Sequence, residues 1–286
     1  MTKVGQKVER DKPIIGLVPA AGQATRLSPL PFSKELFPIG YMRLKGSDDW
    51  RPKPVCMYLL EEMKAAGVKD VFIILRKGKW DIPAYLGDGS LLDMNFAYLM
   101  MNLPFGVPYT LDQAFPFIQD AIVVFGFPDI IFKPDDALLR LLAKQAESGA
   151  DIVLGLFRVS QPHKNDMVGL DGDGRIYEIQ IKPTSTNFCY TWIIAVWASS
   201  FTHFMHEHVA VIRKKKRDKI TGNREVFFSD VIIAAMQNNM QVDKVIFDDG
   251  IYLDIGTHEN LIKAAQLTSE VSWTRNHNGG SRRGIK

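Results

Sequence analysis

The chain has 286 residues, and its 35 Lys and Arg residues against 32 Asp and Glu give a formal net charge of +3. This length can bury a substantial core, and a hydrophobic content of 46% is that of an ordinary folded protein. The near balance of charge does not require a nucleic-acid partner, and no apolar run approaches the roughly 20 residues of a membrane-spanning helix. Collagen-like, wholly disordered and membrane-spanning chains are thereby excluded.

Cysteine usage and the N-terminal segment indicate where the protein works. The only cysteines, Cys56 and Cys189, lack the spacing of metal ligands, so we expect two reduced thiols. The first 12 residues are polar and lack the apolar core of a signal peptide. We therefore predict a cytoplasmic protein with one domain over residues 13–268, a flexible leader over 1–12 and a flexible tail over 269–286.

The first half of the chain alternates apolar strands with amphipathic helices. Strands are predicted over residues 13–18, 71–75, 121–126 and 151–158, and helices over 54–66 and 135–147. The first strand runs into a loop of small residues, Pro19-Ala20-Ala21-Gly22-Gln23-Ala24-Thr25-Arg26, where backbone can come close to a ligand. Such alternation predicts an α/β fold with a mixed, mostly parallel sheet.

The second half is richer in strands. A hairpin is predicted over residues 167–170 and 175–181, around the turn sequence Asp171-Gly172-Asp173-Gly174. Further on, the pattern predicts strands over 190–197 and 242–247, a helix over 230–238 and a closing helix over 258–267 with Thr257 as its N-cap. Additions of this kind to an α/β sheet often build a substrate pocket.

Three segments could carry chemistry. In the loop after the first strand, small residues let backbone N–H groups reach phosphate oxygens, while Arg26 and Lys34 can neutralise charge on a transferring phosphoryl group. The loop matches neither the Walker A nor the dinucleotide-binding pattern, and its alternative interpretation is a turn followed by two surface cations. Asp129 and Asp254 each follow an apolar strand and could together hold Mg²⁺, although each alone is more often a turn former or helix cap.

Taken in order, these segments resemble the sugar-1-phosphate nucleotidyltransferases, and most closely the glucose-1-phosphate thymidylyltransferase branch. The resemblance runs from about Ile14 to Ala265. Its elements are the loop continued to Leu30, then Ser33-Lys34-Glu35-Leu36-Phe37-Pro38-Ile39, Lys53-Pro54-Val55, Ala66-Gly67-Val68, Leu86-Gly87-Asp88-Gly89-Ser90, Asp112-Gln113-Ala114-Phe115, Asp129, Ile179-Gln180-Ile181-Lys182-Pro183 and Leu253-Asp254-Ile255-Gly256-Thr257-His258-Glu259.

The resemblance implies a Rossmann-like, three-layer nucleotidyltransferase fold with a small β-rich sugar-binding lobe. It implies a homo-oligomer that uses Mg²⁺ to transfer a nucleotidyl group from an NTP, with dTTP or UTP favoured, to a sugar-1-phosphate. In this reaction the sugar phosphate attacks the α-phosphorus and expels pyrophosphate.

The resemblance also implies roles for single residues. Arg26 would hold pyrophosphate, Lys34 the polyphosphate and Lys182 the sugar phosphate, while Asp129 and Asp254 would bind the metal. The implied nucleotide subsite consists of Ala20, Ala21, Gly22, Gln23, Phe105, Thr110 and Gln113, and the implied sugar-phosphate subsite of Gly169, Ile181, Lys182 and Tyr252.

Departures from the family pattern fall at specificity positions. Ala24 replaces a glycine of the opening loop, and Phe105 and Thr110 are nearest to where the branch carries a base-reading glutamine and a glycine. Ile181 replaces a carboxylate that precedes the sugar-phosphate lysine, and an isoleucine cannot accept a hydrogen bond from a sugar hydroxyl. Tyr252 replaces a tryptophan. These changes predict an active enzyme with an altered acceptor, such as a deoxy-sugar, modified-sugar or cyclitol phosphate.

Several alternatives stay open from the sequence. A catalytically silent homologue could bind nucleotide and regulate a partner, although retention of the five charged residues argues against it. Asp171-Gly172-Asp173 matches the D-x-D of glycosyltransferases but is more typical of a turn. His203, His206 and His208 and the basic run 213–219 are interpreted as packed or solvated surface. The chain ends soon after the closing helix, so we expect no acyltransferase extension.

Overall fold

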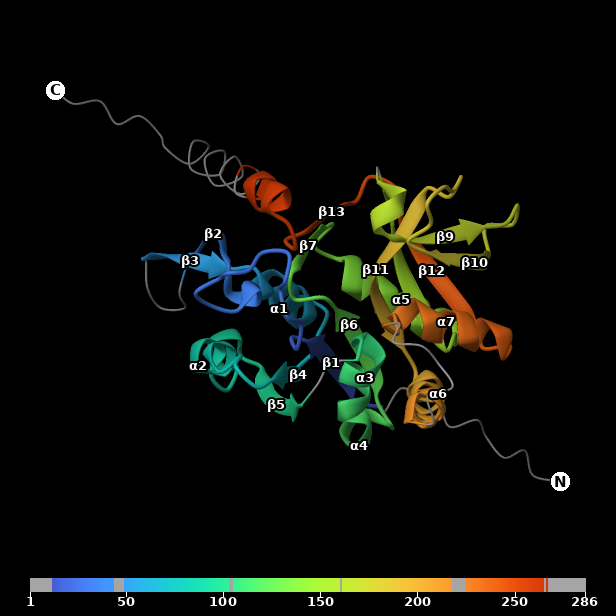
Figure 1. Ribbon diagram of the computed structural model, residues 1–286, viewed down its shortest axis with the longest axis horizontal. Helices are drawn as coiled ribbons and strands as arrows, with labels where there is room; N and C mark the ends of the chain where they lie inside the picture. The colour runs from blue at the N-terminus through green and yellow to red at the C-terminus, as the bar shows by residue number, and fades with distance from the viewer. Residues whose placement is uncertain are drawn as a thin grey trace.

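The computed structural model describes residues 12–43, 49–102, 105–159, 161–217, 225–264 and 266. Residues 1–11 of the expected leader and the whole expected tail, 269–286, lie outside the described residues. A mixed sheet of nine strands forms the centre of the molecule, and helices cover both of its faces (Figure 1). This is the three-layer α/β architecture that the alternation of strands and helices predicts.

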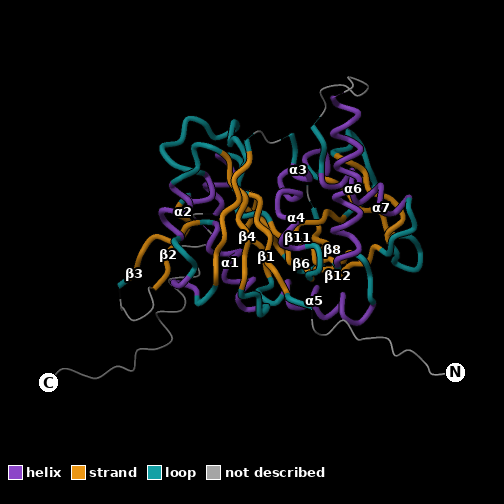
Figure 2. The backbone as a smooth tube through the Cα atoms, turned by 90° about the horizontal axis from the view of Figure 1, so that it is seen from below, coloured by secondary structure: helices purple, strands orange, loops and turns teal. Residues whose placement is uncertain are grey.

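One half of the sheet is wholly parallel. β1 (Ile14–Pro19) lies between β4 (Asp70–Arg76) and β6 (Ile122–Gly126), and β5 (Asn95–Met101) pairs with the outer edge of β4 (Figure 2). The carboxyl ends of parallel strands meet at one edge of a sheet, where open α/β folds bind their ligands. The loops that follow β1, β4, β5 and β6 therefore share this edge.

The other half of the sheet is organised around β11 (Tyr190–Trp197). This strand is antiparallel to β6, to β8 (Ile152–Arg158) and to β9 (Asp166–Leu170), which continues into β10 (Ile176–Ile181). β12 (Val242–Phe247) closes the edge in parallel with β8. The predicted hairpin is confirmed, and Asp171 Oδ1 accepts hydrogen bonds from the N–H groups of Asp173 and Arg175 at 3.0 and 2.7 Å. Asp171 is thus a turn former.

Each face of the sheet has its own core because side chains alternate along buried strands. Leu17 and Phe125 pack with α3 (Val107–Leu111), α6 (Ser199–Arg217) and α7 (Phe228–Gln237). Val18 and Val124 face the opposite way and pack with α1 (Cys56–Ala65) and α5 (Ala137–Ser148). All four of these strand residues are at most 2% exposed, so both helical layers are tightly fixed to the sheet.

Short elements complete the fold and were not all predicted. Two small antiparallel sheets pair β2 (Pro38–Arg43) with β3 (Trp50–Pro54) and β7 (Ile130–Lys133) with β13 (Ile251–Asp254). The remaining helices are α2 (Asp81–Leu86), α4 (Phe115–Ile118), η2 (Lys34–Leu36), η3 (Ser90–Leu92), η4 (Asp112–Ala114) and η5 (Pro162–Lys164). Residues 258–264 are helical, and Thr257 Oγ1 accepts from the Asn260 N–H at 3.3 Å, which confirms the predicted N-cap.

The histidines of α6 are at the surface or partly packed, as expected. His206 Nδ1 lies 2.7 Å from Asp112 Oδ1, its ring stacks on Phe115 with 3.7 Å between centroids, and Arg213 contacts the same carboxylate at 3.1 Å. Within the described residues, no group of three or more His, Cys, Asp and Glu is placed to hold a metal ion. No helix in the described ranges combines the length and apolarity needed to cross a membrane.

The partly buried carboxyl of Glu62 on α1 interacts with the exposed Asp135 and makes stability depend on pH. Burial raises the pKa of Glu62 to about 8, and its hydrogen bond with Asp135 and the repulsion from that group act in the same direction. The folded protein therefore favours neutral Glu62, and this contribution to stability is lost as pH rises from about 4.5 through 8. Glu62→Gln, which keeps this group neutral, is expected to stabilise the protein increasingly across that range. Chemical denaturation from pH 4 to 9 measures the effect, with the exposed Glu147→Gln as control. A pH-independent difference between Glu62→Gln and wild type would contradict it.

Candidate active site

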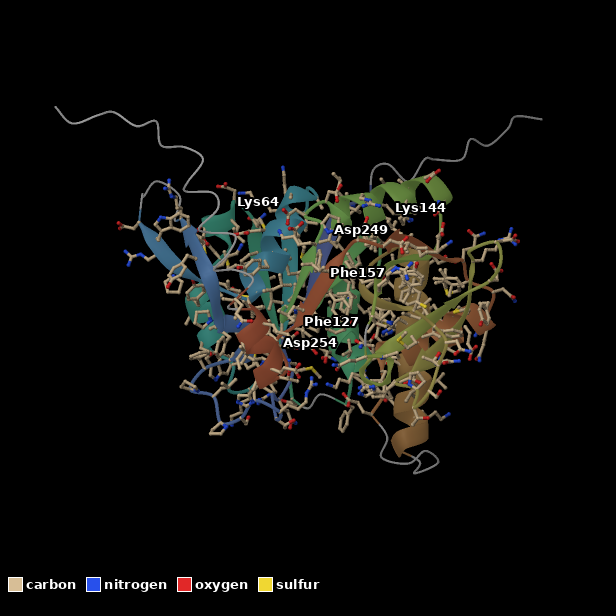
Figure 3. All side chains as sticks on the ribbon, turned by 90° about the horizontal axis from the view of Figure 1, so that it is seen from above. Lys64, Phe127, Lys144, Phe157, Asp249 and Asp254 are labelled. Atoms are coloured by element: carbon tan, nitrogen blue, oxygen red, sulfur yellow. The ribbon has the colours of Figure 1, made fainter. Side chains whose placement is uncertain are left out.

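A cavity of about 590 Å³ opens at the carboxyl edge of the parallel strands. Its lining includes all five charged residues that the sequence singles out, namely Arg26, Lys34, Asp129, Lys182 and Asp254. Asp254 and Phe127, both labelled in Figure 3, line this cavity. The carboxylates follow β6 and end β13, two strands distant in sequence, and the Asp254↔Ile130 pairing of β13 with β7 brings them together. The fold thus gathers separate sequence segments into one charged site.

Lys34 and Asp129 form the buried centre of this site. Lys34 Nζ donates a hydrogen bond to Asp129 Oδ2, and both side chains are largely shielded from solvent. Burial alone would raise the pKa of Asp129, but the charge and hydrogen bond of Lys34 outweigh it and lower that pKa. Burial likewise opposes the charge of Lys34, yet attraction by Asp129, Glu35 and Asp254 leaves its pKa raised. Each group therefore keeps the other ionised.

The pKa of Asp254 is raised, whereas that of Asp129 is lowered. Burial and repulsion from Asp129 raise its pKa, and Lys34 and Arg26 offset this only in part. Arg26 lies 3.8 Å from Asp254 Oδ2, and the Gly256 N–H donates to Oδ1 at 2.7 Å. A Cβ atom at Gly256 would stand 2.7 Å from the Arg26 guanidinium, which ends a largely exposed side chain and would have to shift. The site thus holds two carboxylates that repel one another.

Lys182 approaches the cavity from the end of β10. Its backbone has a φ of 43°, in the left-handed region, which turns the chain sharply after the strand. Its Nζ lies 4.1 Å from the centroid of the Phe227 ring, a cation–π contact at the cavity wall. Lys182 therefore faces the same space as Lys34 from the antiparallel half of the sheet.

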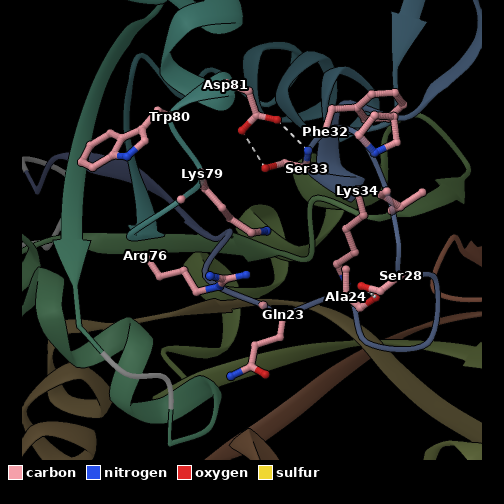
Figure 4. Close-up of a pocket in the computed structure, with 14 residues that line it drawn as sticks. Gln23, Ala24, Ser28, Phe32, Ser33, Lys34, Arg76, Lys79, Trp80 and Asp81 are labelled. Atoms are coloured by element: carbon pink, nitrogen blue, oxygen red, sulfur yellow. Dashed lines mark hydrogen bonds between the residues drawn. The ribbon is translucent and has the colours of Figure 1, made fainter.

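The small-residue loop after β1 separates this cavity from a second one of about 390 Å³. Gly22 and Lys34 line both, whereas Gln23, Arg76 and Lys79 line the second (Figure 4). Ala24, which replaces the expected glycine, has a φ of 54°, a left-handed conformation that costs a non-glycine residue about 1–2 kcal/mol. The loop therefore holds backbone strain at Ala24.

A buried ion pair between Glu35 and Lys79 lies next to Lys34. Lys79 Nζ donates to both carboxylate oxygens of Glu35 at 2.6 Å, and the two side chains are only 4% and 2% exposed. Burial raises the pKa of Glu35 and lowers that of Lys79, so each depends on the other to remain charged. Because Glu35 follows Lys34 directly in η2, this pair fixes the position of the lysine.

The structure distributes the other expected site residues unevenly. Ala21, Gly22 and Thr110 line the main cavity, and Gln23 lines the second. Among the described residues that line neither are Ala20, Phe105, Gln113, Gly169, Ile181 and Tyr252.

These absences have local causes. Ala20 is 1% exposed in the core, and Gln113 donates to the Tyr109 carbonyl at 3.1 Å. Gly169 lies against Phe188, whose ring would be 2.5 Å from a Cβ there, so its backbone is covered. Tyr252 contacts the cavity wall indirectly. Its hydroxyl donates to Asn165 Oδ1 at 3.1 Å, and Asn165 lines the cavity.

Sequence reasoning missed two residues at this site. Gly106 lines the cavity with a φ of 121°, and a Cβ there would lie 2.0 Å from the Val226 carbonyl oxygen, so glycine is required. Its place beside Phe105 was a usable signal, because a glycine is what the family pattern carries near this point. Asp166, at the start of β9, also lines the cavity and gave no sequence signal, since it precedes the hairpin without a motif.

Comparison with known proteins agrees with this geometry. Residues 15–271 match the family model described as nucleotidyl transferase. The chain belongs to this nucleotidyl transferase family. It is 25% identical over 260 residues to the low-salt glycan biosynthesis nucleotidyltransferase Agl11 of Haloferax volcanii, covering 89% of this chain and 66% of that protein. It is also 25% identical over 257 residues to a glucose-1-phosphate thymidylyltransferase of Streptomyces antibioticus, again covering 89% of this chain and 66% of the relative.

A solved structure shares the fold. A Bacillus anthracis protein assigned as a glucose-1-phosphate thymidylyltransferase and crystallised with sucrose superposes with a TM-score of 0.73 at 20% identity. The match covers 89% of this nucleotidyl transferase and 95% of that chain. The predicted fold class and family are therefore confirmed.

The ion pair behind the active site gives a stability test. Lys79→Met in this nucleotidyl transferase leaves Glu35 buried without its partner, which is expected to destabilise the fold by about 3–5 kcal/mol. Replacing both residues by methionine removes the uncompensated charge and should recover most of that loss. Urea unfolding measures both variants, with exposed Lys77→Met as control. A double variant no more stable than Lys79→Met would refute this account.

Proposed function

We propose that the protein transfers a nucleotidyl group from an NTP to a sugar-1-phosphate or a close relative, releasing pyrophosphate. The observation that carries the proposal is the convergence of three cations and two carboxylates on one cavity at the carboxyl edge of the sheet. Family membership supports the reaction class, and relatives named as nucleotidyltransferases support the substrates.

The positions of the cations in the cavity support a separate role for each. A phosphate oxygen of the acceptor forms a bond to the α-phosphorus, and the bond from that phosphorus to the pyrophosphate oxygen breaks. Such a transfer depends on positioning and charge neutralisation more than on a covalent nucleophile. Arg26 and Lys34, beside the small-residue loop, would hold the polyphosphate and the leaving pyrophosphate. Lys182, which follows β10 in the antiparallel half of the sheet, would hold the acceptor phosphate.

The carboxylate pair fits Mg²⁺, which prefers oxygen ligands and commonly takes one or two carboxylates together with substrate phosphates and water. Asp129 and Asp254 line one cavity and raise the energy of the doubly charged state through mutual repulsion. A divalent cation would relieve this repulsion and neutralise phosphate charge when bound. Asp129 and Asp254 would be its protein ligands.

For the nucleobase, we propose dTTP or UTP. The thymidylyltransferase relatives support a thymine-like base, and uracil differs from thymine only by a methyl group. Gly106 and Thr110 line the cavity from the segment around α3 and would border the base. Thr110 Oγ1 donates to the Gly106 carbonyl at 3.4 Å, which ties the two together.

Pyrophosphate release tests the reaction. dTTP, UTP, CTP, ATP and GTP are each paired with glucose 1-phosphate and with deoxy, amino and cyclitol phosphates in the presence of Mg²⁺. At least one pair should turn over, and Asp129→Asn should lower kcat for it by roughly 10²–10³-fold, because a carboxylate ligand of the cation that neutralises the reacting phosphates is lost. Asp173→Asn, on the exposed hairpin, is the matched control. Nucleotide binding without release for any pair would instead favour the regulatory homologue.

Metal binding should depend on pH in a defined direction. Because the pKa of Asp254 is raised, its ionised fraction increases as pH rises through that pKa, and binding of Mg²⁺ displaces the remaining protons. The apparent Mg²⁺ affinity of the NTP-bound protein should therefore increase with pH. Calorimetric titration at several pH values measures it. Asp254→Asn should weaken Mg²⁺ binding and flatten this dependence, and an unchanged slope in that variant would count against Asp254 as a ligand.

A further inference from the structure

The acceptor side of the cavity contains a carboxylate where the sequence suggested none. Ile181 precedes Lys182, and an isoleucine there offers no oxygen to a sugar hydroxyl. In the β9–β10 pairing, however, Ile181 lies opposite Asp166. Paired residues of antiparallel strands share one face of the sheet with Cβ atoms about 4.5–5.5 Å apart. Asp166 lines the cavity and Ile181 does not.

The Asp166 carboxylate is held through one of its oxygens. Oδ2 accepts a hydrogen bond from Ser229 Oγ at 2.6 Å, and Ser229 Oγ in turn accepts from Trp192 Nε1 at 2.8 Å. Ser229 is fully buried and Trp192 is 6% exposed, so this relay is rigid. The Thr191 hydroxyl also donates to the Asp166 carbonyl at 2.8 Å, which fixes the backbone at the same point.

The other oxygen, Oδ1, is shielded from solvent and has no hydrogen-bond partner in the described part of the chain. Burial raises the pKa of Asp166, whereas the Ser229 hydrogen bond, the Lys182 charge and the Lys182 backbone N–H oppose that rise. A shielded carboxylate oxygen without a donor is unfavourable, so a ligand that supplies an O–H group gains by binding here.

The surroundings suit a sugar ring. Trp192 and Phe227 give the wall apolar faces, and Lys182 and Asn165 give it polar groups. A sugar has C–H faces that pack on aromatic rings and hydroxyls that donate to carboxylates. Lys182 is the group expected to hold the sugar phosphate, and its charge acts on the Asp166 carboxylate, which lines the same cavity from the paired strand β9.

We propose that Asp166 Oδ1 accepts a hydrogen bond from a ring hydroxyl of the sugar-1-phosphate and so selects acceptors that carry this hydroxyl. The proposal rests on the proposed transferase function. It reverses the expectation that Ile181 leads to a deoxy acceptor, because the acceptor oxygen is supplied from the opposite strand. Asp166 is thus the specificity-determining residue of the acceptor subsite.

The test combines variants of the protein with deletions of single substrate hydroxyls. Wild type, Asp166→Asn and Asp166→Ala are assayed with glucose 1-phosphate and its 2-, 3-, 4- and 6-deoxy analogues, using the most active NTP. In wild type, one analogue should show kcat/KM lower by about 10–100-fold than glucose 1-phosphate. Both variants should lose a similar factor on glucose 1-phosphate and almost none on that analogue.

Asp166→Asn keeps the shape of the side chain and can still accept from Ser229 through its amide oxygen, so it guards against misfolding. Asp173→Asn, which changes an exposed carboxylate in the turn between β9 and β10, is the matched control and should behave as wild type. Equal losses on all five substrates, or discrimination that survives in both Asp166 variants, would overturn the proposal.

A binding measurement separates this inference from the proposed function. Calorimetry with glucose 1-phosphate and the same analogues, without NTP, reports the hydroxyl contact independently of turnover. Binding that depends on Asp166 and one hydroxyl supports the inference even where no NTP yields pyrophosphate, and in that case only the transferase function fails. Turnover with the same hydroxyl preference in wild type and Asp166 variants leaves the function standing and overturns the role of Asp166.

Discussion

The contact between Lys34 and Asp129 is the interaction on which the site depends. It joins the short helix η2, which follows the loop after β1, to the carboxyl end of β6, and so fixes two neighbouring strand ends relative to one another. Neither charge could remain buried without the other, because removing either partner of a buried pair leaves an uncompensated charge. The position of the small-residue loop, which connects β1 to η2, follows from this contact.

Charges of alternating sign extend from this pair in both directions. On one side, Asp254 raises the negative charge near Asp129 and is balanced in part by Arg26. On the other side, Glu35 and Lys79 form a second buried pair behind Lys34. Asp129 and Asp254 bring like charges together in the cavity, and that is where a divalent cation would fit. Preorganised charge of this kind favours charge that develops in a reaction and costs folding energy.

Features of the fold that depend on local sequence could be predicted. Buried strands such as Ile122–Gly126 read as unbroken apolar runs, and the turn at Asp171 carried its own signature. The short strands β3 and β7 were not predicted, because β3 contains two prolines and β7 is four residues long. Their formation depends on pairing partners that are distant or weakly patterned in sequence.

The candidate site divides in the same way. Charged residues at strand ends, such as Asp129, could be assigned from sequence because parallel strands deliver their carboxyl ends to one edge. The surroundings of Gly169 could not be predicted, since whether a glycine backbone is covered depends on side chains from other segments, here Phe188.

The pairing of β9 with β10 explains how the carboxylate of the acceptor subsite can come from a different strand than in the family motif. A one-dimensional motif treats position 181 as the only source of the carboxylate, but an antiparallel neighbour presents its side chain to nearly the same space. Loss of the acceptor at Ile181 is therefore compatible with an unchanged ligand as long as Asp166 stands opposite. The change is not neutral, because a carboxylate at residue 166 needs its own support. Ser229 and Trp192 provide that support from α7 and β11, two elements that no motif around Lys182 includes. The acceptor subsite is thus a property of three strands and a helix packed together, and the replacement of one motif residue does not by itself define what the site binds.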